Sequence, residues 1–216
     1  MTSRTPPAPL PRIYPIVDDC AWVRRLLPLG VRLIQLRIKE RSLEAIRSEI
    51  RESRALCGRW NAQLVVNDYW QLALEERCDF VHLGQEDLQG ADVPALRRAS
   101  VRIGISTHDH AELDRALTYS PDYIALGPIY PTLLKVMPWS PQGLERITEW
   151  KRRVGTIPLV AIGGLTVARL AGVFAHGADV AAVVTDIVKS ADPEARMREW
   201  LDTEEILTTM PGGAPS

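Results

Sequence analysis

The sequence predicts an α/β fold, and more closely a (β/α)8 TIM barrel in a single domain. Short runs rich in Val and Ile alternate with longer segments of helical period, and eight such runs occur. Strands joined by helical crossovers must lie parallel. Eight βα units in roughly 200 residues favour a compact closed barrel, and a doubly wound open sheet is the competing interpretation. No sequence repeat or low-complexity linker divides the chain.

The individual elements follow from the period of the apolar residues. The strand-like runs lie at 12–17, 31–37, 63–67, 79–84, 101–106, 122–127, 157–163 and 178–184. Helical spacing is clearest at 42–57, where we expect Ser42 to be the N-cap and Leu43, Ile46, Ile50 and Leu56 to lie roughly on one face. The same spacing occurs at 144–154 and 166–177, while the helix between the fourth and fifth strands, near 93–99, is short.

Composition limits the class of protein. The 216 residues are 46% hydrophobic and 25% charged, which suits the core of one domain. A net charge of -1 gives no sign of a nucleic-acid-binding surface. Three cysteines without a C-x-x-C pattern argue against a disulfide framework or a zinc site and favour a reducing cytoplasm.

The two ends differ in composition from the rest. We expect a flexible Pro-rich N-terminus at 1–11, the barrel domain at 12–203 and a flexible tail at 204–216. No run of 18 apolar residues and no signal-like apolar segment occurs, so neither a membrane span nor secretion is expected.

Polar residues gather where the predicted strands end. They are Gln35, Arg37, Lys39, Asn67, Asp68, Glu86, Asp87, Ser106, Thr132, Lys135, Gly163, Gly164 and Thr185. Taken alone, a strand-end Asp is usually a helix N-cap or a solvated turn residue. Seven strand ends together indicate an active site, because (β/α)8 enzymes assemble theirs at the C-terminal ends of the strands.

The residue types indicate the ligand. Arg37, Lys39 and Lys135 supply cations, and Asp68 and Asp87 supply hard oxygen ligands. Mg²⁺ commonly takes one or two carboxylates and completes its shell with water and substrate phosphate, so this set suits a diphosphate with magnesium. The late segments "AIGGL" and "AVVTD" lie where barrels of this kind often hold a phosphate monoester.

Several motifs carry a family resemblance. "QLRIK", "VVND", "HLGQEDL", "GIST", "GPIYPTLLK", "PQGLE", "AIGGL" and "AVVT" occur in the order and at the spacings of thiamine-phosphate synthases. The similarity runs from about Arg12 to Trp200. It implies a Mg²⁺-dependent transferase that joins hydroxymethylpyrimidine diphosphate to thiazole phosphate. The products would be thiamine monophosphate and free inorganic diphosphate.

The resemblance also implies roles for individual residues. The pyrimidine diphosphate would contact Gln35, Arg37, Lys39, Asn67, Ser106 and Lys135, and Asp68 and Asp87 would bind Mg²⁺. The thiazole phosphate would contact Thr132, Leu133, Leu134, Gly164, Val184 and Thr185. Arg37, Lys39, Ser106 and Lys135 would form the catalytic set. The partners are then two small molecules, with a homo-oligomer possible.

Two departures from the family pattern leave alternatives open. Leu134 replaces a usual hydroxyl, and Asp186 adds a carboxylate beside the phosphate-binding "VT", where it should repel phosphate unless it points outward or is neutralised. One alternative is a thiazole tautomerase-type paralogue, which tends to lose the diphosphate-binding residues kept here. The other is a non-catalytic binder of thiazole or thiamine phosphates.

Overall fold

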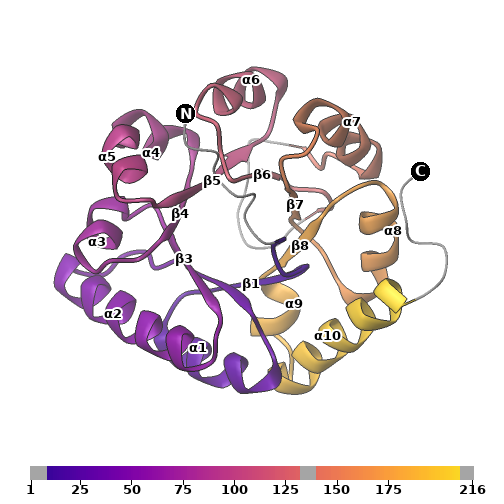
Figure 1. Cartoon of the computed structure of the whole chain (residues 1–216). Coiled ribbons are helices and arrows are strands. Elements are labelled where there is room, and N and C mark those ends of the chain that lie inside the picture. The colour runs from indigo at the N-terminus through magenta and orange to yellow at the C-terminus, as the bar shows by residue number, and fades with distance from the viewer. Residues whose placement is uncertain (1–8, 132–139, 210–216) are drawn as a thin grey trace.

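A computed structural model describes residues 9–131 and 140–209, and it contains a closed parallel barrel (Figure 1). Its strands are β1 (Ile13–Val17), β2 (Leu33–Leu36), β3 (Gln63–Asn67), β4 (Phe80–Leu83), β5 (Arg102–Thr107), β6 (Tyr123–Leu126), β7 (Leu159–Ile162) and β8 (Val180–Val183). β1 pairs with both β2 and β8, with Ile13 opposite Ala181. The predicted (β/α)8 barrel is therefore confirmed, and the open-sheet alternative is wrong.

Helices surround the barrel on the outside (Figure 1). They are α1 (Cys20–Leu26), η1 (Leu27–Leu29), α2 (Leu43–Arg59), α3 (Trp70–Glu75), α4 (Gln85–Gly90), α5 (Val93–Arg98), α6 (His110–Thr118), α7 (Leu144–Val154), η2 (Val167–Arg169), α8 (Leu170–Ala175), α9 (Thr185–Val188) and α10 (Pro193–Thr209). Ser42 caps α2 as expected, because its hydroxyl accepts from the Ala45 amide at 3.3 Å. The helix expected near 93–99 is short, as predicted: it is α5, and it follows α4 in the connection between β4 and β5.

The strands are buried on both faces, which produces two hydrophobic cores. The larger core lies between the barrel and its helices and includes Ile34, Leu126 and Trp150. The smaller core fills the barrel itself and includes Leu33 and Phe80. This explains why the strands read as nearly continuous apolar runs rather than as alternating ones.

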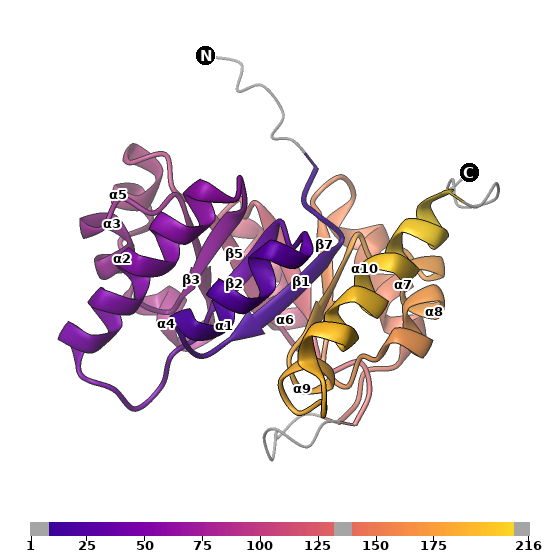
Figure 2. The ribbon, with the colours of Figure 1, turned by 90° about the horizontal axis from the view of Figure 1, so that it is seen from below.

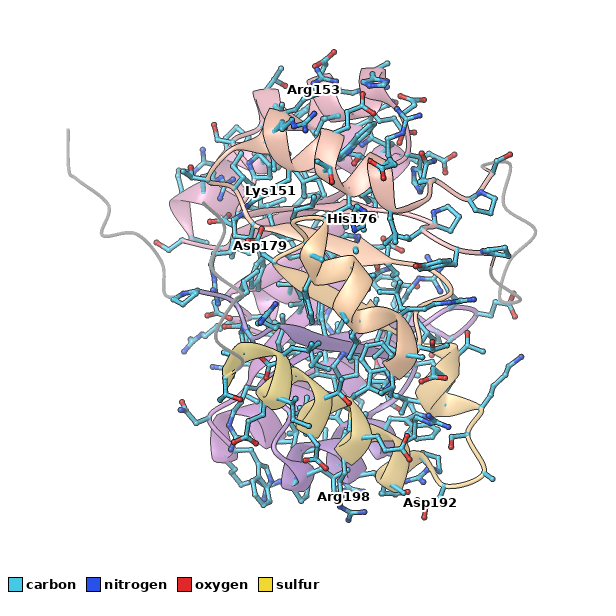
Figure 3. All side chains as sticks on the ribbon, turned by 90° about the vertical axis from the view of Figure 1, so that its right-hand side faces the viewer. Lys151, Arg153, His176, Asp179, Asp192 and Arg198 are labelled. Atoms are coloured by element: carbon cyan, nitrogen blue, oxygen red, sulfur yellow. The ribbon has the colours of Figure 1, made fainter. Side chains whose placement is uncertain are left out.

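An ion pair links an outer helix to the strands. Lys151 in α7 donates to Asp179 Oδ2 at 2.7 Å, and the same oxygen accepts from the Leu159 amide at 2.7 Å (Figure 3). α7 is thereby fixed against the N-terminal ends of β7 and β8. Within residues 9–131 and 140–209, no helix is long and apolar enough to cross a membrane.

Candidate active site

The polar strand ends lie on one side of the barrel. Because all strands are parallel, the C-terminal ends of β2, β3 and β5 open onto the same face. α9 follows β8 and lies on the lower side of the barrel in Figure 2, the side to which β1 points. Gln35 in β2, Asn67 at the end of β3 and Ser106 in β5 belong to this face.

Two carboxylates lie beside each other at the ends of β3 and β4. The pKa of Asp87 is raised, first by burial and then by the negative charge of Asp68. Lys39 forms an ion pair with Asp68 Oδ2 and offsets part of this repulsion. Asp68 has a left-handed backbone with φ +63°, a strained conformation of the kind that recurs at functional sites. The pair forms a local excess of negative charge that a further cation would relieve.

The donor set suits magnesium better than a closed metal cage. Among the residues that the structure describes, no group of three or more His, Cys, Asp and Glu side chains is placed to hold a metal ion. Asp68 and Asp87 therefore offer two hard oxygen ligands without a third protein carboxylate. Mg²⁺ commonly binds in this way, with water and substrate phosphate completing its octahedral shell.

A cation and an amide lie at the C-terminal ends of the neighbouring strands β2 and β3. Arg37 is exposed directly after β2, and its guanidinium has no ion pair with any residue of the described ranges. The residue Asn67 is 4% exposed, and its side chain makes no hydrogen bond to a described group. Both are thus available to a ligand at the rim.

Two glycines after β7 allow a second loop to approach closely. Gly163 and Gly164 have φ +99° and +64°, and a Cβ on Gly164 would lie 2.5 Å from the Pro131 carbonyl oxygen. The Tyr130 amide donates to the Gly163 carbonyl at 3.0 Å. Arg169 binds the Gly164 carbonyl and lies 4.1 Å above the Tyr130 ring. Val184 and Thr185, at the start of α9, follow the neighbouring strand.

Asp186 points away from this second region. Its Oδ2 accepts a hydrogen bond from Trp200 Nε1 of α10 at 2.8 Å, and Arg196 lies 4.0 Å away. The sequence left open whether this carboxylate would repel a phosphate, and the structure shows that it is turned outward and paired. Asp186 therefore gives no reason to reject a phosphate ligand.

The predicted residues Thr132, Leu133, Leu134 and Lys135 lie outside the described residues. Three side chains that the sequence analysis did not assign to the site connect two of the residues that it did assign. Gln35 and Ser106 are joined through buried Tyr14, Tyr123 and His82. The sequence could have indicated them only through Tyr and His at inward-facing positions of strands. This signal is weak, because buried Tyr and His also occur in ordinary hydrophobic cores.

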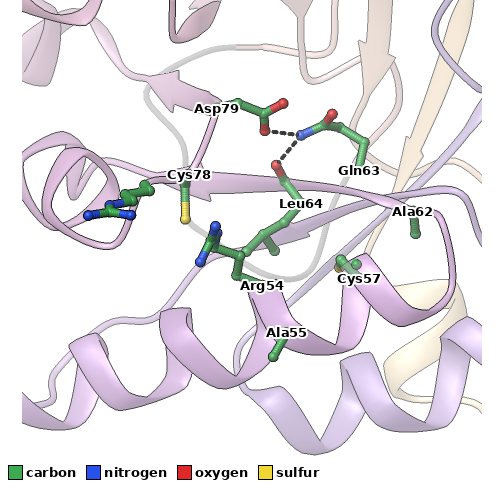
Figure 4. Close-up of a pocket in the computed structure, with 10 residues that line it drawn as sticks. Arg54, Ala55, Cys57, Ala62, Gln63, Leu64, Cys78 and Asp79 are labelled. Carbon is green, nitrogen blue, oxygen red and sulfur yellow. Dashed lines mark hydrogen bonds between the residues drawn. The ribbon is translucent and has the colours of Figure 1, made fainter. Parts of the chain in front are cut away.

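A separate hollow lies near the start of β3, away from this rim. It measures about 530 Å³ and is lined by Arg54, Cys57, Gln63, Cys78 and Asp79, among others (Figure 4). Gln63 donates to Asp79 Oδ1 at 2.7 Å across its edge. Because it lies at the N-terminal ends of the strands, this hollow is not part of the candidate site.

The closed barrel and its polar C-terminal rim define a (β/α)8-barrel enzyme. A family model described as "Thiamine monophosphate synthase" matches residues 13–187. The chain belongs to this family, and the family-level resemblance read from the motifs is confirmed.

Individual relatives agree with this assignment. The chain is 58% identical over 188 residues to a thiamine-phosphate synthase of Rhizobium etli, covering 87% of this chain and 92% of that protein. It is 48% identical over 188 residues to the thiamine-phosphate synthase of Escherichia coli K12, covering 87% and 89%. A solved thiamine phosphate pyrophosphorylase of Pyrococcus furiosus superposes with a TM-score of 0.78 at 28% identity, covering 91% and 96%.

Proposed function

We propose that the chain condenses hydroxymethylpyrimidine diphosphate with thiazole phosphate in a Mg²⁺-dependent reaction, releasing diphosphate and thiamine monophosphate. Family membership supports the reaction class. The observation that carries the metal assignment is the adjacent pair Asp68 and Asp87, with Lys39 bound to one member and exposed Arg37 nearby. This arrangement fits a metal diphosphate better than a metal-free monophosphate.

Asp68 and Asp87 would hold the ion, and the ion would supply positive charge to the diphosphate. Lys39 and Arg37 then bind the diphosphate oxygens and stabilise the charge that grows on them as the leaving group departs. Lys135 would join them, although it lies outside the described residues. These cationic side chains are already in position before the reaction, so they can stabilise the diphosphate without the reorganisation that water at the rim would need.

The bond changes need no protein nucleophile. The carbon–oxygen bond between the pyrimidine methylene and the diphosphate breaks, and its electron pair leaves with the diphosphate. The thiazole nitrogen supplies the pair for the new carbon–nitrogen bond, and the ring amino group of the pyrimidine stabilises the positive charge between the two events. Gln35, Asn67 and Ser106 would orient the pyrimidine, so the work of the protein is positioning and electrostatic stabilisation.

The second substrate would bind beside the two glycines after β7. Gly164, Val184 and Thr185 would hold the thiazole phosphate, with Thr132, Leu133 and Leu134 contributing from outside the described residues. The outward orientation of Asp186 supports this assignment because it removes the expected repulsion. We also place the enzyme in a reducing cytoplasm, which the three buried free thiols support.

The test is diphosphate release by the purified chain with both substrates, with and without Mg²⁺. Asp68→Ala should abolish release, and Asp202→Ala, an exposed change on α10, should leave it unchanged. Metal-dependent release that needs both substrates supports the synthase. Absence of release while thiazole phosphate still binds would favour a non-catalytic binder, and isomerisation of the thiazole in its place would favour a tautomerase.

A further inference from the structure

A continuous series of side-chain hydrogen bonds crosses the interior of the barrel. Gln35 Nε2 donates to the Tyr14 hydroxyl at 2.9 Å, and the Tyr14 and Tyr123 hydroxyls are 3.1 Å apart. The Tyr123 hydroxyl lies 2.7 Å from His82 Nδ1, and His82 Nε2 lies 2.7 Å from Ser106 Oγ. We call these five side chains the relay. Both of its ends, Gln35 and Ser106, are residues that we assign to the pyrimidine.

The chemistry of the groups gives the relay a direction. An amide nitrogen can only donate, so the Tyr14 oxygen accepts from Gln35, and its own proton has one acceptor among the described groups, the Tyr123 oxygen. Tyr14 and Tyr123 are 1% and 0% exposed, so a hydroxyl proton left without an acceptor there would be costly.

The direction continues through the histidine. The Tyr123 proton points to His82 Nδ1, which must then be unprotonated. An imidazole whose Nδ1 accepts a hydrogen bond carries its single proton on Nε2. Nε2 donates to Ser106 Oγ, and this leaves the Ser106 proton free to point at a ligand.

The backbone makes room for this arrangement. Gly104 in β5 lies between the pairing partners His82 and Tyr123. A Cβ on Gly104 would lie 2.0 Å from Tyr123 Cζ, so only glycine lets the ring lie in the barrel. The His82 and Tyr123 rings stack with 5.6 Å between centroids and 13° between planes. The relay therefore depends on a glycine in the neighbouring strand as well as on its own polar atoms.

We propose that Tyr14, Tyr123 and His82 are positioning residues that make Ser106 a hydrogen-bond donor and Gln35 Oε1 an acceptor toward the substrate. No described group donates to Gln35 Oε1, so this oxygen is free for a ligand. A 4-aminopyrimidine carries the complementary groups, an amino donor and ring-nitrogen acceptors. This inference rests on the proposed function, because it takes Gln35 and Ser106 to be pyrimidine contacts.

The first test reads the tautomer of His82 in the ligand-free protein. Long-range proton–nitrogen NMR spectra of chain labelled with ¹⁵N-histidine distinguish protonation at Nε2 from protonation at Nδ1, and His82→Gln identifies the signal. We expect the Nε2–H form near pH 7. The Nδ1–H form would overturn the direction of the relay, whether or not the chain condenses the two substrates.

The second test separates positioning from general stability. Tyr123→Phe keeps the ring and removes the hydroxyl, so KM for the pyrimidine diphosphate should rise about tenfold while KM for thiazole phosphate stays unchanged. Tyr14→Phe breaks the relay one link earlier and should show the same selective change in KM. It replaces Tyr123→Phe in the test if that variant does not fold.

Tyr119→Phe is the matched control, because Tyr119 is half-buried outside the relay and its hydroxyl makes no hydrogen bond to a described group. It should leave both KM values unchanged. Equal rises in both KM values for a relay variant, or no rise in either, would overturn the positioning role. A wild-type chain that shows the expected tautomer but releases no diphosphate would refute the proposed function and leave the direction of the relay standing.

Discussion

At the scale of single residues, the space beside Asp87 controls the proposed metal site. A Cβ on Gly84 would lie 3.1 Å from Asp87 Oδ2, while the φ of -73° at Gly84 suits any residue. Gly84→Ala should therefore displace the carboxylate by a few tenths of an ångström without straining the backbone. We expect the Mg²⁺ concentration for half-maximal diphosphate release to rise roughly threefold to tenfold.

Gly90→Ala provides the control for this change. Gly90 is the last residue of α4, the helix that Gly84 precedes as N-cap, and a Cβ on Gly90 would have no atom within 4 Å. Its Mg²⁺ dependence should match that of the original chain. An unchanged Mg²⁺ requirement in Gly84→Ala, with normal folding by circular dichroism, would mean that Asp87 is not a metal ligand.

The sequence predicted the acidic pair but not the relay. Asp68 and Asp87 follow successive strands, and the parallel arrangement alone brings such residues to one face. Their mutual effect, the raised pKa of Asp87, agrees with that prediction. The link from Tyr14 to Tyr123 joins β1 to β6, which are not neighbours in the barrel. Such a contact depends on the curvature of the closed barrel and on Gly104, which a linear pattern does not reveal.

At the scale of elements, the loop after β7 depends on glycine for its contact with residues 128–131. Gly163→Ala would place a Cβ 2.6 Å from the Pro128 Cα while keeping φ +99°. The left-handed backbone and the backbone clash together should lower the free energy of unfolding by roughly 3 kcal/mol or more. Chemical denaturation measures this change, and the KM for thiazole phosphate should rise with it.

Gly30→Ala separates strain from clash. Gly30 has φ +109°, but a Cβ there would meet its nearest atom, in the Leu201 side chain, at an ordinary 3.7 Å. Gly30→Ala should lower the free energy of unfolding by about 1–2 kcal/mol, because only the backbone conformation is strained. If Gly163→Ala and Gly30→Ala lower the free energy of unfolding equally, the close approach between the loop after β7 and residues 128–131 does not add to the cost of substituting Gly163.

The contact between α9 and α10 gives a second prediction at this scale. Asp186→Ala leaves the Trp200 Nε1 donor, in a residue that is 0% exposed, without its acceptor. The free energy of unfolding should fall by roughly 1–3 kcal/mol in Asp186→Ala. It should fall by less in Asp186→Asn, because an acceptor for Trp200 Nε1 remains. KM for thiazole phosphate should not change in either variant. A clear fall in KM for Asp186→Asn would show that the carboxylate repels the phosphate after all.

The sequence predicted the elements better than their contacts. All eight expected strands formed, because continuous Val and Ile runs between helical segments are specific to buried parallel strands. The orientation of Asp186 could not be predicted, because it depends on the distant Trp200 packing against α9. Family patterns describe which residue types occur at a position, whereas the side-chain direction comes from tertiary packing.

At the scale of the whole molecule, the core between barrel and helices encloses all three thiols. Cys20, Cys57 and Cys78 are buried, and desolvation raises their pKa values to about 11, 12 and 11. The thiolate is the reactive form, and a pKa of about 11 leaves roughly 100-fold less of it at pH 8 than an ordinary thiol has. Alkylation of the folded chain by iodoacetamide should therefore be slow at pH 8.

The pH dependence distinguishes reaction in the folded state from reaction after unfolding. A raised pKa keeps the thiol protonated, so labelling of the folded chain should keep increasing with pH beyond about pH 9, where labelling of the unfolded chain in denaturant levels off. Cys57 and Cys78 line the hollow near the start of β3, so mass spectrometry should find them modified no faster than Cys20 if burial alone controls access. Rapid modification of these two thiols at pH 8 would mean that the reagent reaches them, either through the hollow that they line or by local opening of the barrel there.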